Sequence, residues 1–349
     1  MTRLRALLCL LLTCAALPGA AQEAVRRFGP EDAPTLLVLR TTTDIASFAP
    51  TVEAFLATRP DIALRYEQWG SNDLYALTAA DCAADRPGAD VVISSGVHQM
   101  VDLVNDHCAA PRISPETTAL PDLLRWRDEI WGISREPAVM VYNRRLVPPG
   151  DVPRTRFDLL DLLRNREDIY GGKVATYDIE ESGLGFLFAF MDSQEASTFG
   201  ALMEAFARSG AVATCCSAEI IDGVARGDYL IAYNVLGSYA QQQADRNSDL
   251  GIAAPEDYTL VLSRAAILPG RAPSAAAGAF LDFILSPQGQ LAMTASHLNI
   301  SASALTRNAE TGSEDSRSRL IPLKPPLLVA MDRMKAARFV ARWRDAFGN

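Results

Sequence analysis

Three points in the chain combine polar side chains with a change from strand-like to helix-like sequence. They are Thr41 to Asp44, Ser94 with Ser95, and Glu181 to Gly183. At the start of a helix, free backbone N–H groups and the positive end of the helix dipole favour an anion, and a glycine lets it approach closely. Serine, threonine and aspartate are also ordinary helix caps, so capping is the alternative for each single junction. Three such junctions in one chain favour a shared ligand site.

Two arginines stand in extended apolar segments. Arg135 and Arg264 each interrupt such a segment, where a charge is costly unless it is paired or binds a ligand. Glu136 and Asp257 are near enough in the sequence to act as partners. The sequence therefore leaves two roles open for each arginine, namely direct ligand contact or an internal ion pair.

Further polar and aromatic candidates occur in the second half of the chain. Tyr239 and Tyr258 either wall the ligand site or belong to the core with a hydrated hydroxyl. Asn234 and Ser238 flank the first of these tyrosines and are candidate hydrogen-bonding partners for a ligand.

Motifs of common enzymes are absent from the sequence. It contains no G-x-S-x-G, no Walker A loop, no G-x-G-x-x-G and no H-E-x-x-H. Carboxylates are numerous, but no pair stands out as a general acid and base. The three histidines are scattered and no C-x-x-C occurs, so we predict no metal site and no cofactor. The expected protein is not an enzyme, with a hydrolase as the alternative.

The first residues have the pattern of a secretory signal peptide. Two arginines precede an apolar segment of about a dozen residues, and "LPGAAQ" offers small residues for cleavage after Ala21. Residues 1–21 are therefore the expected signal peptide, and lipid anchoring at Cys14 is the alternative. No later hydrophobic stretch is long enough to span a bilayer. We expect a periplasmic protein without membrane insertion after cleavage.

The charge balance excludes one class of partner. The formal net charge is -9, and loss of the two signal-peptide arginines makes it -11. An acidic chain without a run of basic residues offers no positively charged surface to which nucleic acid would bind.

Four cysteines follow the signal peptide. Cys82, Cys108, Cys215 and Cys216 can pair in three ways in an oxidising compartment. We favour a Cys82–Cys108 bridge. The adjacent pair either forms a vicinal disulfide or keeps one or both thiols.

The elements that position these residues alternate between strand and helix patterns. This alternation starts at "TLLVLRTTTD" and again at "KVATYD". It indicates α/β structure with largely parallel sheets. Extended runs at 129–143 and 257–269 are suited to cross between two lobes. About 330 residues exceed what one core usually serves, which also favours two lobes. Residues 22–34 are polar and are expected to form a loose arm.

In order and combination, several segments resemble bacterial periplasmic solute-binding proteins of ABC transporters, in the iron(III)/phosphoglycerate-type group. The resemblance covers nearly all of the mature chain and rests on "TTTD", "WGISREPAVMVYN", "GKVATYDIEESGLGFL", "GDYLIAYNVLGSYA" and "PEDYTLVLSRAAILP". It implies the α/β, two-lobed periplasmic-binding-protein fold (Venus flytrap, class II type), with a mixed sheet flanked by helices in each lobe. Lobe 1 would be residues 35–141 plus 260–349, and lobe 2 residues 142–259.

The resemblance also implies a role. Such a protein closes its lobes on a solute and presents it to an ABC permease, or signals its presence to a two-component sensor kinase. Ferric-binding members use adjacent tyrosines where this chain has Gly237-Ser238-Tyr239, which makes iron(III) the weaker alternative. We therefore predict a small organic anion, either a phosphorylated or a carboxylated metabolite. The predicted ligand-binding residues are Thr42, Thr43, Asp44, Ser94, Ser95, Arg135, Glu136, Ser182, Gly183, Asn234, Ser238, Tyr239, Asp257, Tyr258 and Arg264.

Overall fold

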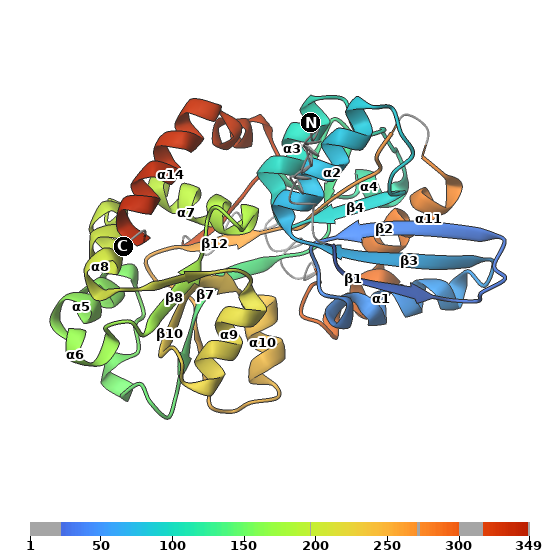
Figure 1. Ribbon diagram of the computed structural model, residues 1–349. Coiled ribbons are helices and arrows are strands. Elements are labelled where there is room, and N and C mark those ends of the chain that lie inside the picture. Colours follow the sequence, from blue (N-terminus) through green and yellow to red (C-terminus); the bar gives the residue numbers. More distant parts are fainter. Residues whose placement is uncertain (1–21, 196, 271–272, 300–316, 348–349) are drawn as a thin grey trace, which may run out of the picture.

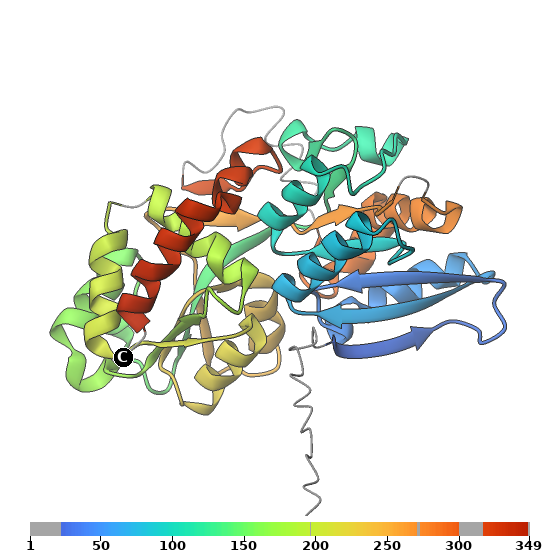
Figure 2. The same cartoon turned by 45° about the horizontal axis from the view of Figure 1, so that its top comes forward.

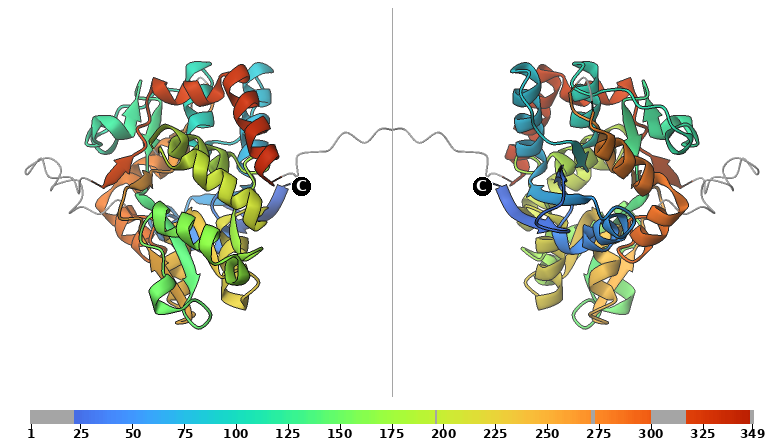
Figure 3. Two further views of the ribbon diagram at one scale, coloured as in Figure 1. Left: turned by 90° about the vertical axis from the view of Figure 1, so that its left-hand side faces the viewer. Right: turned by 90° about the vertical axis from the view of Figure 1, so that its right-hand side faces the viewer.

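Two lobes, each built around one β-sheet, make up the molecule. The computed structural model describes residues 22–195, 197–270, 273–299 and 317–347. The lobes lie side by side in Figures 1 and 2. The end views of Figure 3 show helices packed around the sheets. The predicted two-lobed α/β fold is confirmed, whereas the predicted signal peptide, residues 1–21, lies outside the described residues.

The sheet of lobe 1 has the strand order β1-β3-β2-β4-β13-β6-β5. Its central strands β2, β3 and β4 run parallel, and β1 and β13 pair antiparallel with their neighbours. The strands are β1 (Gln22–Phe28), β2 (Thr35–Thr41), β3 (Ile62–Trp69), β4 (Val91–Ser94), β5 (Arg125–Trp126), β6 (Ile130–Gly132) and β13 (Ala265–Ile267). The helices are α1 (Ile45–Thr58), α2 (Ser71–Ala83), α3 (Val97–Asn105), α4 (Pro115–Thr118), α11 (Ala275–Leu285) and α12 (Pro287–Thr294).

The N-terminal segment corrects one expectation. Residues 22–28 are the edge strand β1, paired with β3, and not part of a loose arm. Nearly all of its side chains are exposed, so the strand lacks the apolar alternation by which strands are recognised. The pairing comes from backbone hydrogen bonds along β3, which the side-chain pattern does not reveal.

The sheet of lobe 2 has the order β14-β12-β7-β10-β8-β9, and β11 also pairs with β7. Parallel and antiparallel pairs are mixed, as predicted. The strands are β7 (Glu136–Asn143), β8 (Val174–Tyr177), β9 (Val212–Thr214), β10 (Ile231–Leu236), β11 (Leu250–Ala253), β12 (Thr259–Leu262) and β14 (Ser318–Leu320). The helices are α5 (Arg156–Asn165), α6 (Glu167–Tyr170), α7 (Gly183–Glu195), α8 (Phe199–Ser209), α9 (Ser217–Arg226) and α10 (Gly237–Ala244).

Two adjacent crossings join the lobes. The chain passes from β6 to β7 and returns from β12 to β13, within the two extended runs that the sequence indicated. The crossings are hydrogen-bonded to each other, because Ile133 N donates to Arg264 O and Arg264 N donates to Ser134 Oγ, both at 2.9 Å. These two crossings form a short double linker, and the chain connects the lobes again between α12 of lobe 1 and β14 of lobe 2.

The C-terminal helix α14 (Arg333–Phe347) packs on lobe 2. It follows the 3₁₀ segment η3 (Pro325–Met331), lies across α7 and α8 in Figure 1, and contacts α8. Phe339 stacks on Phe199, and Phe347 packs on Phe206. This packing differs from the expectation that residues 260–349 all belong to lobe 1. The remaining lobe boundaries stay predictions.

Both cysteine pairs are bonded. Cys82 at the end of α2 is linked to Cys108 after α3, which confirms the predicted bridge. Cys215 is linked to Cys216, one of the two states that the sequence left open. In the part of the chain that the structure describes, no helix is long and apolar enough to cross a membrane.

Candidate ligand site between the lobes

A small cleft lies where the two lobes meet. Its volume is about 80 Å³, which is roughly the volume of three water molecules in the liquid. Lobe 1 contributes Thr42, Trp69 and Ser95 to its lining, and lobe 2 contributes Ser182 and Tyr239. Two larger hollows, of about 490 Å³ and 660 Å³, lie beside the Cys82–Cys108 disulfide and along α14. We take the smaller one as the candidate site because the strand ends of both lobes converge on it.

The starts of six helices surround this cleft. Helices α1, α2 and α3 of lobe 1 and α7, α9 and α10 of lobe 2 begin there. The N-cap residues of α1, α2, α3, α9 and α10 make no side-chain capping bond, although Gln68 Oε1 accepts a hydrogen bond from Ile45 N of α1 at 3.0 Å. The lining includes one residue within two positions of each start: Asp44, Gly70, Ser95, Ser182, Cys216 and Leu236. Both lobes therefore direct uncapped N–H groups and positive helix ends at one small space, which suits an anion.

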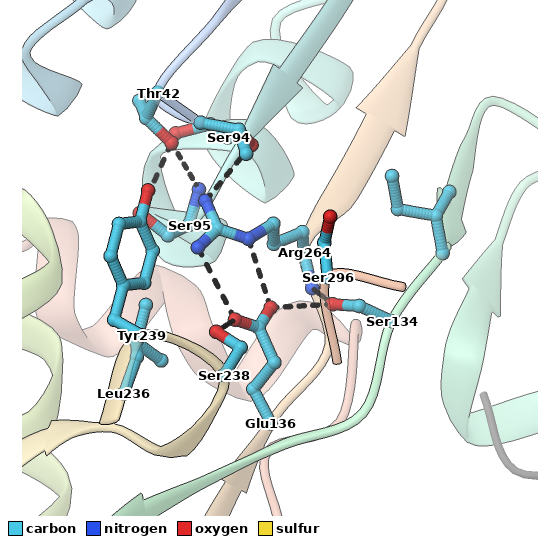
Figure 4. Close-up of polar contacts among 12 residues, drawn as sticks. Thr42, Ser94, Ser95, Ser134, Glu136, Leu236, Ser238, Tyr239, Arg264 and Ser296 are labelled. Carbon is cyan, nitrogen blue, oxygen red and sulfur yellow. Dashed lines mark hydrogen bonds and ion pairs between the residues drawn. The ribbon is translucent and has the colours of Figure 1, made fainter. Parts of the chain in front are cut away.

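On the lobe 1 side, two hydroxyl residues are held close together. Thr42 Oγ1 accepts a hydrogen bond from Ser95 N at 3.0 Å and lies 3.2 Å from Ser95 Oγ (Figure 4). The contact joins the ends of β2 and β4, which are neighbours in the sheet. Both residues line the cleft, so their hydroxyls are placed to reach a ligand.

On the lobe 2 side, Ser182 and Gly183 start helix α7. Ser182 Oγ accepts a hydrogen bond from Gly185 N at 3.0 Å, which is a capping contact. Gly183 N donates to Ser71 Oγ of lobe 1 at 2.8 Å. A Cβ atom at Gly183 would lie 2.8 Å from Gln99 Nε2, so a larger residue would require the Gln99 side chain to move. Capping by Ser182 is thus present, and ligand contact by Ser182 stays a prediction.

Arg264 forms a buried ion pair with Glu136 at the lobe crossing. Arg264 Nε lies 2.9 Å from Glu136 Oε1, and Ser134 and Ser238 also donate to this carboxylate (Figure 4). Arg264 Nη1 donates to Thr43 Oγ1 at 3.1 Å. Burial alone would lower the pKa of Arg264, but the nearby Glu136 carboxylate raises it above its usual value. The internal partner predicted as one possibility is therefore present, while Arg264 still lines the cleft.

Tyr239 links the lobes and presents a neutral hydroxyl. Asp44 N of lobe 1 donates to Tyr239 Oη at 3.2 Å. Burial raises the pKa of Tyr239 to about 12, so the phenol keeps its proton near pH 7. Burial also raises the pKa of Asp44, although Arg264 opposes this shift. A neutral phenol O–H is a hydrogen-bond donor from which an anion can accept.

The structure sorts the predicted residues into groups. Five of the predicted residues lie behind the lining of the cleft and are hydrogen-bonded to a lining residue, to a helix start or to one another. They are Thr43, Ser94, Glu136, Gly183 and Ser238. Arg135 is half-buried and does not line the cleft. The residues in the lining itself are Thr42, Asp44, Ser95, Ser182, Tyr239 and Arg264.

Three predicted residues belong to a different cluster inside lobe 2. Asn234 Nδ2 and Tyr258 Oη donate to Asp192, at 2.5 and 2.7 Å. Arg156 pairs with Asp192 at 2.9 Å and with Asp257 at 3.2 Å. Asn234 has φ +59° at a register shift in β10. These residues stabilise lobe 2 internally and are not brought to the cleft.

Several lining residues were missed by sequence reasoning. Gly70-Ser71 and Cys216-Ser217 are also strand-to-helix junctions, at the starts of α2 and α9. The same junction rule would have found both. Trp69 and Tyr177 end strands β3 and β8 and carry no separate signal, because buried aromatics are common in cores. Among the described residues, no group of three or more His, Cys, Asp and Glu side chains is arranged to hold a metal ion.

A two-lobed fold with a cleft between the lobes is typical of solute-binding proteins. The chain belongs to the family of bacterial extracellular solute-binding proteins, whose model matches residues 73–322. This confirms the resemblance noted in the sequence.

Solved structures agree with this assignment. The substrate-binding protein of an ABC transporter from Agrobacterium tumefaciens is 30% identical, with a TM-score of 0.86 over 94% of this chain and 99% of that one. AfuA from Actinobacillus pleuropneumoniae, with fructose-6-phosphate bound, is 15% identical, with a TM-score of 0.69 over 90% and 99%. Iron-bound HitA from Pseudomonas aeruginosa is 16% identical, with a TM-score of 0.64 over 90% and 99%. At these low identities, AfuA and HitA show only that their fold is similar to that of this chain. None of the curated proteins shows significant sequence similarity to this chain.

Proposed function

We propose that this protein captures a small organic anion, a phosphorylated or carboxylated metabolite, in the cleft between its lobes. One observation carries the proposal: six helices from both lobes start at the cleft, and four of them, α2, α3, α9 and α10, have no side-chain cap. An anion would accept hydrogen bonds from these N–H groups and would lie at the positive ends of the helix dipoles. Thr42, Ser95 and Tyr239 would add hydroxyl donors.

Iron(III) is the second candidate, because HitA shares the fold with iron bound. The site argues for the anion. A ferric ion needs anionic oxygen ligands, whereas the helix starts at the cleft carry partial positive charge. The sequence contains no adjacent tyrosine pair. AfuA, with a sugar phosphate bound, shows that the same fold also serves an organic anion.

The proposed protein acts in the periplasm and holds its ligand without converting it. It would present the anion to the permease of an ABC transporter, the arrangement named for the Agrobacterium relative. A two-component sensor kinase is the alternative partner. Uptake of the labelled anion by cells lacking this protein separates the two: lost uptake supports the importer, and normal uptake with a lost transcriptional response supports the kinase.

A thermal-shift screen of the protein from Gln22 onward tests the ligand class. The panel contains phosphorylated C3–C6 metabolites, di- and tricarboxylates, and ferric citrate with citrate alone as its control. A ligand at a hundred times its Kd stabilises the folded state by about 2.7 kcal/mol, which moves Tm by degrees. A shift with an organic anion is expected. A shift confined to ferric iron, or turnover of the anion, would contradict the proposal.

A further inference from the structure

The Cys215–Cys216 disulfide lies on the ligand cleft. Both cysteines line it, next to Ser217 and Ala218 at the start of α9. Cys216 is exposed and Cys215 is half-buried, so one face of the bonded pair is open to the cleft and to solvent. The other disulfide, Cys82–Cys108, lines a separate hollow within lobe 1.

The surrounding structure holds this pair in place. Cys216 has φ +47°, a left-handed backbone conformation that L-residues rarely adopt, directly before α9. The next residue, Ser217, is buried, and its hydroxyl contacts the hydroxyl of Tyr177 and accepts a hydrogen bond from Leu236 N at 3.2 Å. On the other side, Asp178 N donates to Thr214 O at 2.8 Å. The disulfide is therefore fixed between the ends of β8, β9 and β10.

The disulfide makes part of the cleft apolar, whereas the helix starts provide hydrogen-bond donors. A bonded cysteine pair has no N–H or O–H to donate, and its sulfur atoms are polarisable and largely apolar. Trp69 of lobe 1 and Leu184 and Leu236 of lobe 2 also line the cleft. The site thus combines hydrogen-bond donors for an anion with an apolar wall that includes the disulfide.

We infer that the Cys215–Cys216 disulfide is a specificity-determining part of the ligand site and contacts an apolar portion of the ligand. The ligand would then be an anion that carries a hydrocarbon face, and not a bare inorganic anion. This inference rests on the proposed function, because it adds an apolar portion to the anionic ligand proposed there. Reduction to two thiols would separate the sulfur atoms and remove the wall.

Matched pairs of probes test the inference. Inorganic phosphate and n-propyl phosphate share the anionic group and differ by an apolar chain, and acetate and butyrate do the same for carboxylates. At the usual value per buried CH₂ group, the three carbon atoms of propyl phosphate improve affinity roughly 60-fold and the two extra carbon atoms of butyrate roughly 15-fold. Calorimetric titration of the parent is expected to show this gain for the alkyl member of at least one pair.

Two double variants test whether the higher affinity for the alkyl anion comes from the Cys215–Cys216 disulfide. C215S/C216S is expected to lose most of the gain, taken as the ratio of its affinities for the alkyl and the bare anion. C82S/C108S also loses one disulfide, but away from the cleft, and is expected to keep the gain. An equal gain in both variants, or bare-anion binding without any gain in the parent, would overturn the inference and leave the proposed function standing. Failure of every anion to bind the parent would remove the proposed function and the inference together.

A reversible measurement covers the case in which C215S/C216S does not fold. In C82S/C108S starting at Gln22, Cys215–Cys216 is the only disulfide left. Dithiothreitol supplies two electrons and two protons: the S–S bond breaks, two thiols form, and the reagent closes to its cyclic disulfide. The gain should disappear on reduction and return after oxidised glutathione restores the bond. A gain that persists in the dithiol form, verified by alkylation and mass spectrometry, would contradict the inference.

Discussion

At the residue scale, the charged and hydroxyl side chains at the cleft are held by one another before any ligand arrives. Arg264 is paired with Glu136, and Thr42 with Ser95. Such prior pairing lowers the entropic cost of binding, because the donors are already in place. Ser182 caps α7, and its contact with the ligand is a prediction.

Replacing Ser182 separates its two roles. We expect Ser182→Ala to cost about 1 kcal/mol of stability through the lost cap. Its affinity for the organic anion should fall on the order of 10-fold or more, because a hydrogen bond to a charged group is lost. Urea unfolding and calorimetric titration measure the two effects. Thr155→Ala, which removes the cap of α5 away from the cleft, is the control. If both variants kept parental affinity, Ser182 would be a cap alone.

His98 makes the stability of the molecule depend on pH. Its buried ring stacks on Phe186 of the other lobe, with 5.6 Å between ring centroids, and burial lowers its pKa to about 3. Between pH 6.5 and 3 the unfolded chain therefore binds a proton that the folded chain does not. His98 then makes the free energy of unfolding fall with decreasing pH, by at most about 1.4 kcal/mol per pH unit.

Urea unfolding from pH 7 to pH 4 checks this expectation. His98→Phe keeps an aromatic ring without the titrating nitrogen, so its stability should depend less on pH than that of the parent. His107→Asn is the control, because His107 is exposed and asparagine tolerates its φ of +60°. An unchanged pH dependence in His98→Phe would refute the assignment.

At the scale of elements, the junctions between strands and helices create the site. The sequence indicated three of them correctly, since polar residues follow apolar strands at Thr42, Ser95 and Ser182. The sequence could not predict the positions of Asn234 and Tyr258, because their partner Asp192 lies on helix α7, far away in the chain. It also missed β1, whose exposed side chains show no apolar period. Local patterns thus predict where elements start, and tertiary packing decides which side chains meet.

The start of α7 is also a contact between the lobes, and Gly183 allows it. We expect Gly183→Ala to weaken ligand binding roughly 10-fold, because the new methyl group would overlap the Gln99–Asn72 pair of lobe 1 when the lobes close. Calorimetric titration measures the loss. Gly200→Ala in α8 is the matched control, since its Cβ meets nothing within 4 Å. Equal affinity in the two variants would show that this contact does not limit closure.

At the scale of the whole molecule, the lobes touch along a set of hydrogen bonds around the cleft. Ser47 Oγ donates to Gln242 Oε1 at 2.9 Å, and Asn72 Nδ2 donates to Glu180 O at 2.9 Å. The two adjacent crossings form one linker about which the lobes can separate. A ligand that contacts both lobes favours this closed arrangement through its preference for the closed state.

The central claim is that an organic anion lies at the helix starts between the lobes and is hydrogen-bonded by Tyr239. The most direct test is calorimetric titration of parent and Tyr239→Phe with the organic anion that gives the largest thermal shift. We expect the variant to bind on the order of 10- to 100-fold more weakly, as for a lost hydrogen bond to a charged group. Equal affinity in parent and variant would place the anion elsewhere and contradict the claim.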